Sequence, residues 1–295
     1  MSLVVKRFLR EGPAVAGLAV LIIVIGAAII GPLVDPFSPI AISHALLGNP
    51  LAPSPAHPFG TDLLGRDELA RALVGARVSL TIGFTAMVVG IVFGTLYGAI
   101  SGAAGGVVDA LMMRVVDALL SFPSFFLIIT VEALTDHFTL AVVVLVIGML
   151  SWMGVARLVR GEILSVRERD FVEAARALGV GPVRLLFRHL IPNAFAPVVV
   201  AATLAVGDNI LTEAGLSFLG LGVQVPTPSW GNMLQDALLP AAQSAPWLIL
   251  VPGLLIVVTL LAFNVVGEGI RIAFDRSISQ SAAPAASSAA EEAAA

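Results

Sequence analysis

Long runs of apolar residues fill much of this chain of 295 residues, and they restrict its fold more than any other feature. Hydrophobic residues make up 58% of the sequence and charged residues only 12%, whereas a soluble domain carries about 25% charged residues. A helix of about 20 apolar residues is long enough to cross a bilayer. Because lipid offers no partners to free backbone groups, such runs must be helical. The sequence therefore predicts an all-α, polytopic membrane protein.

Six runs have the length and composition of transmembrane helices. We expect them at about residues 13–33, 79–100, 107–130, 140–159, 194–216 and 245–270. The third run is the weakest, because Asp109, Arg114 and Asp117 interrupt it; Arg114 and Asp117 are one turn apart and are expected to neutralise each other. The first run lacks a small-residue cleavage site at its end, so we interpret it as a retained span rather than a signal peptide.

The cations indicate how these spans are oriented. They gather before the first span (Lys6, Arg7, Arg10), in an insert between the fourth and fifth spans (residues 157–188), and after the sixth span (Arg271, Arg276). With six spans, these three regions lie on one side of the membrane, and the positive-inside rule makes that side the cytoplasm. We therefore expect the N- and C-termini to be cytoplasmic.

Four parts follow along the chain. Residues 1–34 form the N-terminus and first helix, and residues 35–77 form an extracytoplasmic loop with an interfacial helix at 67–73. Residues 78–270 form a core of five helices that includes the insert at 163–192. Residues 271–295 form a cytoplasmic tail, which we expect to be disordered from about residue 277 because it is rich in Ala and Ser without apolar periodicity.

The insert predicts a helix-turn-helix. Good helix formers run from Asp170 to Leu178, and Gly179 then suits a left-handed C-cap. Pro182 is well placed to begin a second helix, and Pro192 to end or kink it.

This insert resembles the EAA loop of ATP-binding-cassette (ABC) importer permeases. The residues that match that loop are Glu173, Ala174, Ala175, Gly179, Ile191 and Pro192. The resemblance implies the transmembrane domain of a type I ABC importer in the bacterial inner membrane, docked onto an ATPase through this loop. The residues that it assigns to ATPase coupling are Asp170, Glu173, Ala174, Ala175, Arg176, Leu178 and Gly179.

Three further segments resemble the second permease of dipeptide, oligopeptide and nickel importers. They are H-x-x-G-T-D-x-x-G-R-D at 57–67, G-G-x-x-D with M-R-x-x-D and Pro at 105–123, and E-x-x-L-S-F-L-G-L-G with P-x-P-x-W-G at 213–231. The resemblance implies import of di- or oligopeptides by alternating access. It also implies a second permease subunit, two ATPase domains that carry ATP and Mg²⁺, and an extracytoplasmic binding protein. This chain itself would need no cofactor. Nickel chelates or another small solute remain an alternative substrate.

The fifth span carries polar residues at helical spacing: Asp208, Asn209, Thr212 and Glu213. Charged residues inside a membrane usually face protein or water. The four polar residues of the fifth span therefore predict either a polar stripe along the translocation path or a structural contact with a partner subunit. Elsewhere, Gly90, Gly94 and Gly98 predict close helix packing, and Trp152, Trp230 and Trp247 are expected to be interfacial anchors.

Other classes of function fit less well. The chain has no G-x-x-x-x-G-K-[ST] motif, so ATP must bind elsewhere, and it has no cysteine and no metal-ligand spacing among its histidines. An intramembrane serine protease using Ser217 would need a later histidine, but the last one is His189. A self-sufficient secondary transporter with Asp208 or Glu213 as coupling acids would explain neither the insert nor the absence of a repeated half.

Overall fold

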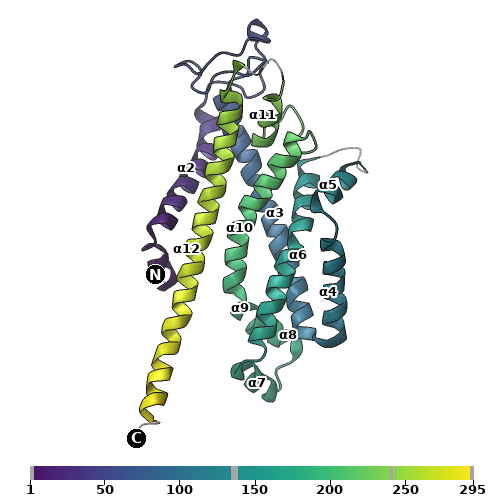
Figure 1. The fold of residues 1–295 in the computed structure, drawn as a ribbon, viewed down its shortest axis with the longest axis vertical. Coiled ribbons are helices and arrows are strands. Elements are labelled where there is room, and N and C mark those ends of the chain that lie inside the picture. The colour runs from purple at the N-terminus through teal and green to yellow at the C-terminus, as the bar shows by residue number, and fades with distance from the viewer. Residues whose placement is uncertain (1–2, 134–138, 240–241, 243, 293–295) are drawn as a thin grey trace.

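The structure is a computed structural model that describes residues 3–133, 139–239, 242 and 244–292. The described residues form helices joined by loops (Figure 1). In chain order the elements are α1 (Leu3–Phe8), α2 (Gly12–Val34), η1 (His44–Leu46), α3 (Glu68–Ala104), α4 (Gly106–Leu120), α5 (Ser124–Ala133), α6 (Leu140–Val166), α7 (Asp170–Ala177), α8 (Pro182–Leu185), η2 (Leu186–Leu190), α9 (Ile191–Asn193), α10 (Phe195–Phe218), α11 (Trp230–Asp236) and α12 (Trp247–Glu292).

The long helices form one elongated bundle. α3 packs along α6, α10 packs against both α3 and α12, and α2 packs against α12 (Figure 1). The loop before α3 and the α11 segment cover one end of this bundle, which we call the loop end. α7 and α8 lie at the opposite end, which we call the hairpin end.

Within the described residues, five helices are long and apolar enough to cross a membrane: α2, α3, α6, α10 and residues Trp247–Phe274 of α12. The third span that we expected at 107–130 is not one helix. It is divided into α4 and α5 by a break at residues 121–123. Pro123 has no amide hydrogen for a helical bond and disfavours helical geometry at Phe122, which explains the break.

Two helices extend beyond their expected ends. The interfacial helix expected at 67–73 is not separate, because Glu68 begins α3 and the helix continues without interruption to Ala104. Asp67 caps its first turn by accepting from the amide of Ala70 at 2.8 Å. The tail that we expected to be disordered from about residue 277 instead continues α12 to Glu292. Six alanines between residues 282 and 290 favour a helix, although Pro284 and the serines among them do not.

Glycines allow α3 and α6 to meet backbone to backbone, as their four-residue spacing predicted. A Cβ atom at Gly94 would lie 2.6 Å from the carbonyl oxygen of Trp152, and one at Gly98 would clash with the carbonyl of Ala156. Trp152 itself is 5% exposed in this contact. Its expected role as an interfacial anchor is therefore wrong.

Candidate functional site

The EAA-like insert folds into a helical hairpin of α7 and α8 at the end of the bundle (Figure 1). The turn between them is a Schellman motif. The amide of Gly179 donates to the carbonyl of Arg176 at 2.9 Å, and the amide of Val180 donates to the carbonyl of Ala175 at 3.1 Å. Gly179 has a φ of 78°, so the predicted left-handed C-cap is confirmed. Pro182 begins α8, also as predicted.

The inner face of the hairpin is anchored in the bundle. Val172 is 0% exposed and Ala175 is 8% exposed. Both belong to a core cluster with Ile163 and Val166 at the end of α6, and this cluster continues to Val198 on α10. Ala175 is therefore a packing residue that fixes α7 to α6, although the EAA resemblance assigns it to coupling along with its exposed neighbours.

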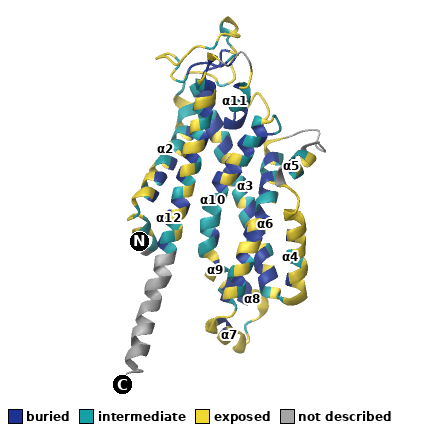
Figure 2. Cartoon of the chain, viewed as in Figure 1, coloured by how far each residue is buried: buried dark blue, intermediate teal, exposed yellow. Residues whose placement is uncertain are grey.

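The outer face of the hairpin is exposed (Figure 2). It includes six of the seven residues assigned to coupling: Asp170, Glu173, Ala174, Arg176, Leu178 and Gly179. Leu178 is 85% exposed. Sequence reasoning missed three further apolar side chains in this part of the chain, Phe171, Val183 and Phe187, which are 38%, 69% and 56% exposed. Large apolar residues inside a polar insert are the signal that could have found them.

A groove of about 440 Å³ lies along α6 and α10, with Ile128 of α5 at its edge. Three of the four residues predicted for the translocation path line it: Asp208, Asn209 and Thr212. Ser151 of α6 adds a further hydroxyl, and most of the remaining lining is aliphatic. The structure thus brings polar groups of α6 and α10 to the same groove, although Asn209 is only 3% exposed and its side-chain amide donates to the carbonyl of Gly83 on α3.

Glu213, the fourth residue predicted for the path, lies elsewhere. It is 0% exposed, and its carboxylate accepts from the hydroxyls of Ser79 at 2.8 Å and Ser217 at 2.6 Å. Ser217 in turn accepts from the amide of Val223 at 2.9 Å. Residues five apart on a helix are rotated by about 140° from each other, so Glu213 cannot share the face of Asp208. Its carboxylate fixes α10 to α3 and to the following loop.

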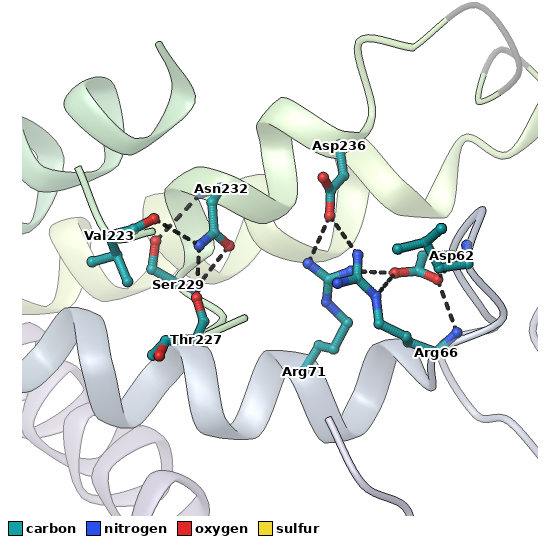
Figure 3. Close-up of polar contacts among 9 residues, drawn as sticks. Asp62, Arg66, Arg71, Val223, Thr227, Ser229, Asn232 and Asp236 are labelled. Atoms are coloured by element: carbon teal, nitrogen blue, oxygen red, sulfur yellow. Dashed lines mark hydrogen bonds and ion pairs between the residues drawn. The ribbon is translucent and has the colours of Figure 1, made fainter. Parts of the chain in front are cut away.

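The loop end is held by a network of charges in which Asp62, Arg66 and Arg71 are buried and Asp236 is partly exposed (Figure 3). Arg66 and Arg71 both donate to one carboxylate oxygen of Asp236 on α11, at 2.8 and 2.7 Å. Both arginines also pair with Asp62, which is 1% exposed. This network joins the loop before α3 to the segment that carries α11.

A buried tryptophan extends this contact at the loop end. Trp230 of α11 is 0% exposed, and its ring nitrogen donates to the carbonyl of Ala72 at 3.2 Å. The ring nitrogen of Trp247 donates to the carbonyl of Thr61 at 3.1 Å. For Trp230, complete burial excludes the interfacial role that we expected.

The helix bundle, the hairpin and the groove define a membrane-spanning subunit of a transporter. Residues 78–280 match the family described as binding-protein-dependent transport system inner membrane component. The chain belongs to this family of multi-pass, non-catalytic inner-membrane permeases. Residues 1–56 match a second model, the N-terminal transmembrane domain of oligopeptide transport permease C.

Curated relatives cover nearly the whole chain. The oligopeptide transport system permease protein OppC of Escherichia coli K12 is 44% identical over 270 residues, which is 92% of this chain and 89% of that protein. OppC of Bacillus subtilis is 40% identical over 271 residues, which is 91% of this chain and 87% of that protein.

One solved structure, of the MetNI methionine ABC transporter in inward-facing conformations, shares the fold. It matches with a TM-score of 0.54 at 21% identity and covers 68% of this chain and 94% of that one. At this identity the match concerns the fold alone.

Proposed function

We propose that this chain is one permease subunit of an ATP-driven importer of di- or oligopeptides. The 44% identity with an oligopeptide permease over 92% of the chain supports the substrate class. The exposed outer face of the hairpin is the observation that carries the proposed coupling. It combines Glu173 and Arg176 with the apolar side chains of Leu178 and Val183. Exposed apolar side chains beside charged ones are typical of a surface that binds another protein.

The proposed partner of this outer face is an ATPase subunit. Two ATPase domains would bind ATP and Mg²⁺, because this chain has no phosphate-binding motif. Asp170, Glu173, Ala174, Arg176, Leu178 and Gly179 would meet the ATPase, while Ala175 would keep α7 fixed to α6. The hairpin end, with both termini, would face the cytoplasm, in line with the distribution of cations. The loop end would face the extracytoplasmic binding protein.

The proposed transmission of force uses two helices. α6 contributes Ile163 and Val166 to the core beneath the hairpin, and it contributes Ser151 and Gly154 to the groove. α10 likewise contributes Val198 to that core and lines the groove farther along its length. A displacement of the hairpin by the ATPase would therefore move both walls of the groove, because packed helices transmit displacement.

The groove would form half of the translocation path. Asp208, Asn209 and Thr212 would line that path, whereas Glu213 would serve only as a structural anchor. A second permease subunit would supply the facing wall. This heterodimer would then open alternately to the two sides of the membrane.

Transport by the purified complex tests this function. The complex is isolated from its native membrane, reconstituted into vesicles and supplied with binding protein and radiolabelled trialanine. We expect accumulation that requires ATP on the hairpin side and stops with a non-hydrolysable analogue. Accumulation without ATP would contradict the proposal and favour a secondary transporter. ATP-dependent uptake of a nickel chelate without uptake of peptide would contradict the substrate class.

A further inference from the structure

Among the described residues that line the groove, Asp208 alone has an ionisable side chain. Its side chain is exposed there. It lies near the middle of α10, about 20 Å from the first residue of the helix and about 15 Å from the last. A charged carboxylate at this depth in a membrane is energetically unfavourable, so such residues usually have a partner or mark a functional site.

Two carboxylates on α4, those of Asp109 and Asp117, are paired with arginines of α6. Asp109 forms an ion pair with Arg160 at 2.6 Å, and Asp117 pairs with Arg157. Within the described part of the chain, no Lys, Arg or His forms an ion pair with Asp208. Its carboxylate is therefore available to a cation that enters the groove.

The hydroxyl groups of the groove also favour a cationic donor. The hydroxyl of Thr212 donates to the carbonyl of Asp208 at 2.8 Å, and that of Ser151 donates to the carbonyl of Gly148 at 3.1 Å. A hydroxyl has one hydrogen to donate and two lone pairs that accept. With their hydrogens engaged within the helices, these two groups offer the groove acceptors. An ammonium group has three donors and no acceptor, so its chemistry complements these acceptors.

We infer that Asp208 binds an ammonium group of the transported substrate. This inference rests on the proposed peptide import and names the feature of the peptide that the groove recognises. Every peptide with a free N-terminus carries an α-ammonium group, so one carboxylate serves peptides of different sequence. The aliphatic remainder of the groove makes no side-chain hydrogen bonds that would select among them. A lysine side chain offers the same chemistry, and the test distinguishes the two sources.

Labelling of a single cysteine measures this binding without transport. The chain has no cysteine, and a Cβ built at Gly154 in the groove meets no atom within 4 Å beyond the adjacent backbone of its own helix. The complex carrying Gly154→Cys is treated with a maleimide in the presence of trialanine, N-acetyl-trialanine or N-acetyl-Ala-Lys-Ala. Labelling of this chain is followed by mass spectrometry. Ser121→Cys, at an exposed position outside the groove, is the control.

We expect trialanine to slow labelling at position 154 by about tenfold more than N-acetyl-trialanine does, the difference expected for a charge-assisted contact. Protection by N-acetyl-Ala-Lys-Ala would show that a side-chain ammonium is also bound. Asp208→Asn should abolish the difference between free and acetylated trialanine, and Asp208→Glu should keep most of it. Equal protection by both trialanine forms, no protection by either, or a difference that survives Asp208→Asn would overturn the inference.

Uptake measured on the same preparation separates this inference from the proposed function. ATP-driven uptake of trialanine by a complex whose labelling is insensitive to Asp208 would contradict the ammonium site alone. Failure of ATP-driven peptide uptake by the complex without substitutions would contradict the importer, whatever the labelling shows.

Discussion

The guanidinium of Arg77 on α3 donates to the carbonyl oxygen of Ala28 on α2, with 3.2 Å between Nε and the oxygen. That carbonyl would accept from residue 32 in a regular helix, but residue 32 is a proline inside α2. Arg77 also donates to the carbonyl of Ile29 at 3.0 Å. A cation on α3 thus satisfies a backbone group that a proline leaves free on α2.

Replacing Arg77 should therefore cost stability in a way that depends on Pro32. We expect Arg77→Leu to lower the free energy of unfolding by about 1–2 kcal/mol, because the Ala28 carbonyl loses its donor. In a Pro32→Ala background the intrahelical bond is restored, and the cost of Arg77→Leu should fall by at least half. Thermal denaturation of the four proteins of this double-mutant cycle measures the coupling. Equal costs in the two backgrounds would contradict the explanation.

Gly98 should tolerate no side chain. A Cβ atom there would meet the main chain of Ala156 across the α3–α6 contact, so we expect Gly98→Ala to destabilise the protein by about 1–3 kcal/mol. Gly161→Ala is the matched control, because a Cβ at Gly161 meets no atom within 4 Å beyond the adjacent backbone of its own helix. The control should be neutral or slightly stabilising, since alanine is the better helix former. Size-exclusion chromatography after heating gives the midpoint of thermal denaturation for each variant. Equal midpoints for the two variants would contradict the close contact.

Asp236 should be important for attaching α11 at the loop end. Its removal takes away one of the two carboxylates with which both Arg66 and Arg71 form ion pairs. Because Asp236 itself is 32% exposed, solvent screening reduces the cost of Asp236→Ala to about 1–3 kcal/mol. Glu268→Gln removes a surface pair with Arg271 and should cost less than about 1 kcal/mol. Limited proteolysis of residues 219–229 provides the readout, with faster cleavage expected for Asp236→Ala only.

Two glycines in the hairpin turn should respond differently to alanine. Gly179 has a φ of 78°, whereas Gly181 has a φ of −65° that any residue adopts. The left-handed conformation costs an alanine about 1–2 kcal/mol, which should loosen the hairpin and lower ATP-driven uptake several-fold. Gly181→Ala should retain most of the uptake. Similar uptake by the two variants would show that the Schellman turn is not needed for coupling.

The hairpin was predictable because its signals are local. Gly179 and Pro182 fix the turn through their own backbone conformations, and no distant residue is needed. The face of α7 that is buried against the bundle was not predictable in this way. Burial of Val172 and Ala175 depends on contacts with α6, which adjacent sequence does not contain.

Long-range contacts explain two other differences, at Asp117 and at Glu213. Asp117 pairs with Arg157 on α6 rather than with Arg114, its neighbour in sequence. Its expected partner lies one turn away, whereas the observed one lies 40 residues later. Helical geometry alone could have separated Glu213 from Asp208, but its contact with Ser79 is again a tertiary one.

Coupling through the outer face of the hairpin is the central claim, and copurification tests it most directly. The tagged chain is purified in gentle detergent from its native membrane, and its partners are identified by mass spectrometry. We predict recovery of a second permease and an ATPase, with loss of the ATPase alone in Glu173→Arg. Glu268→Arg, which reverses an exposed charge on α12, should retain both partners. A Glu173→Arg protein that keeps its ATPase and full ATP-driven uptake would contradict the account.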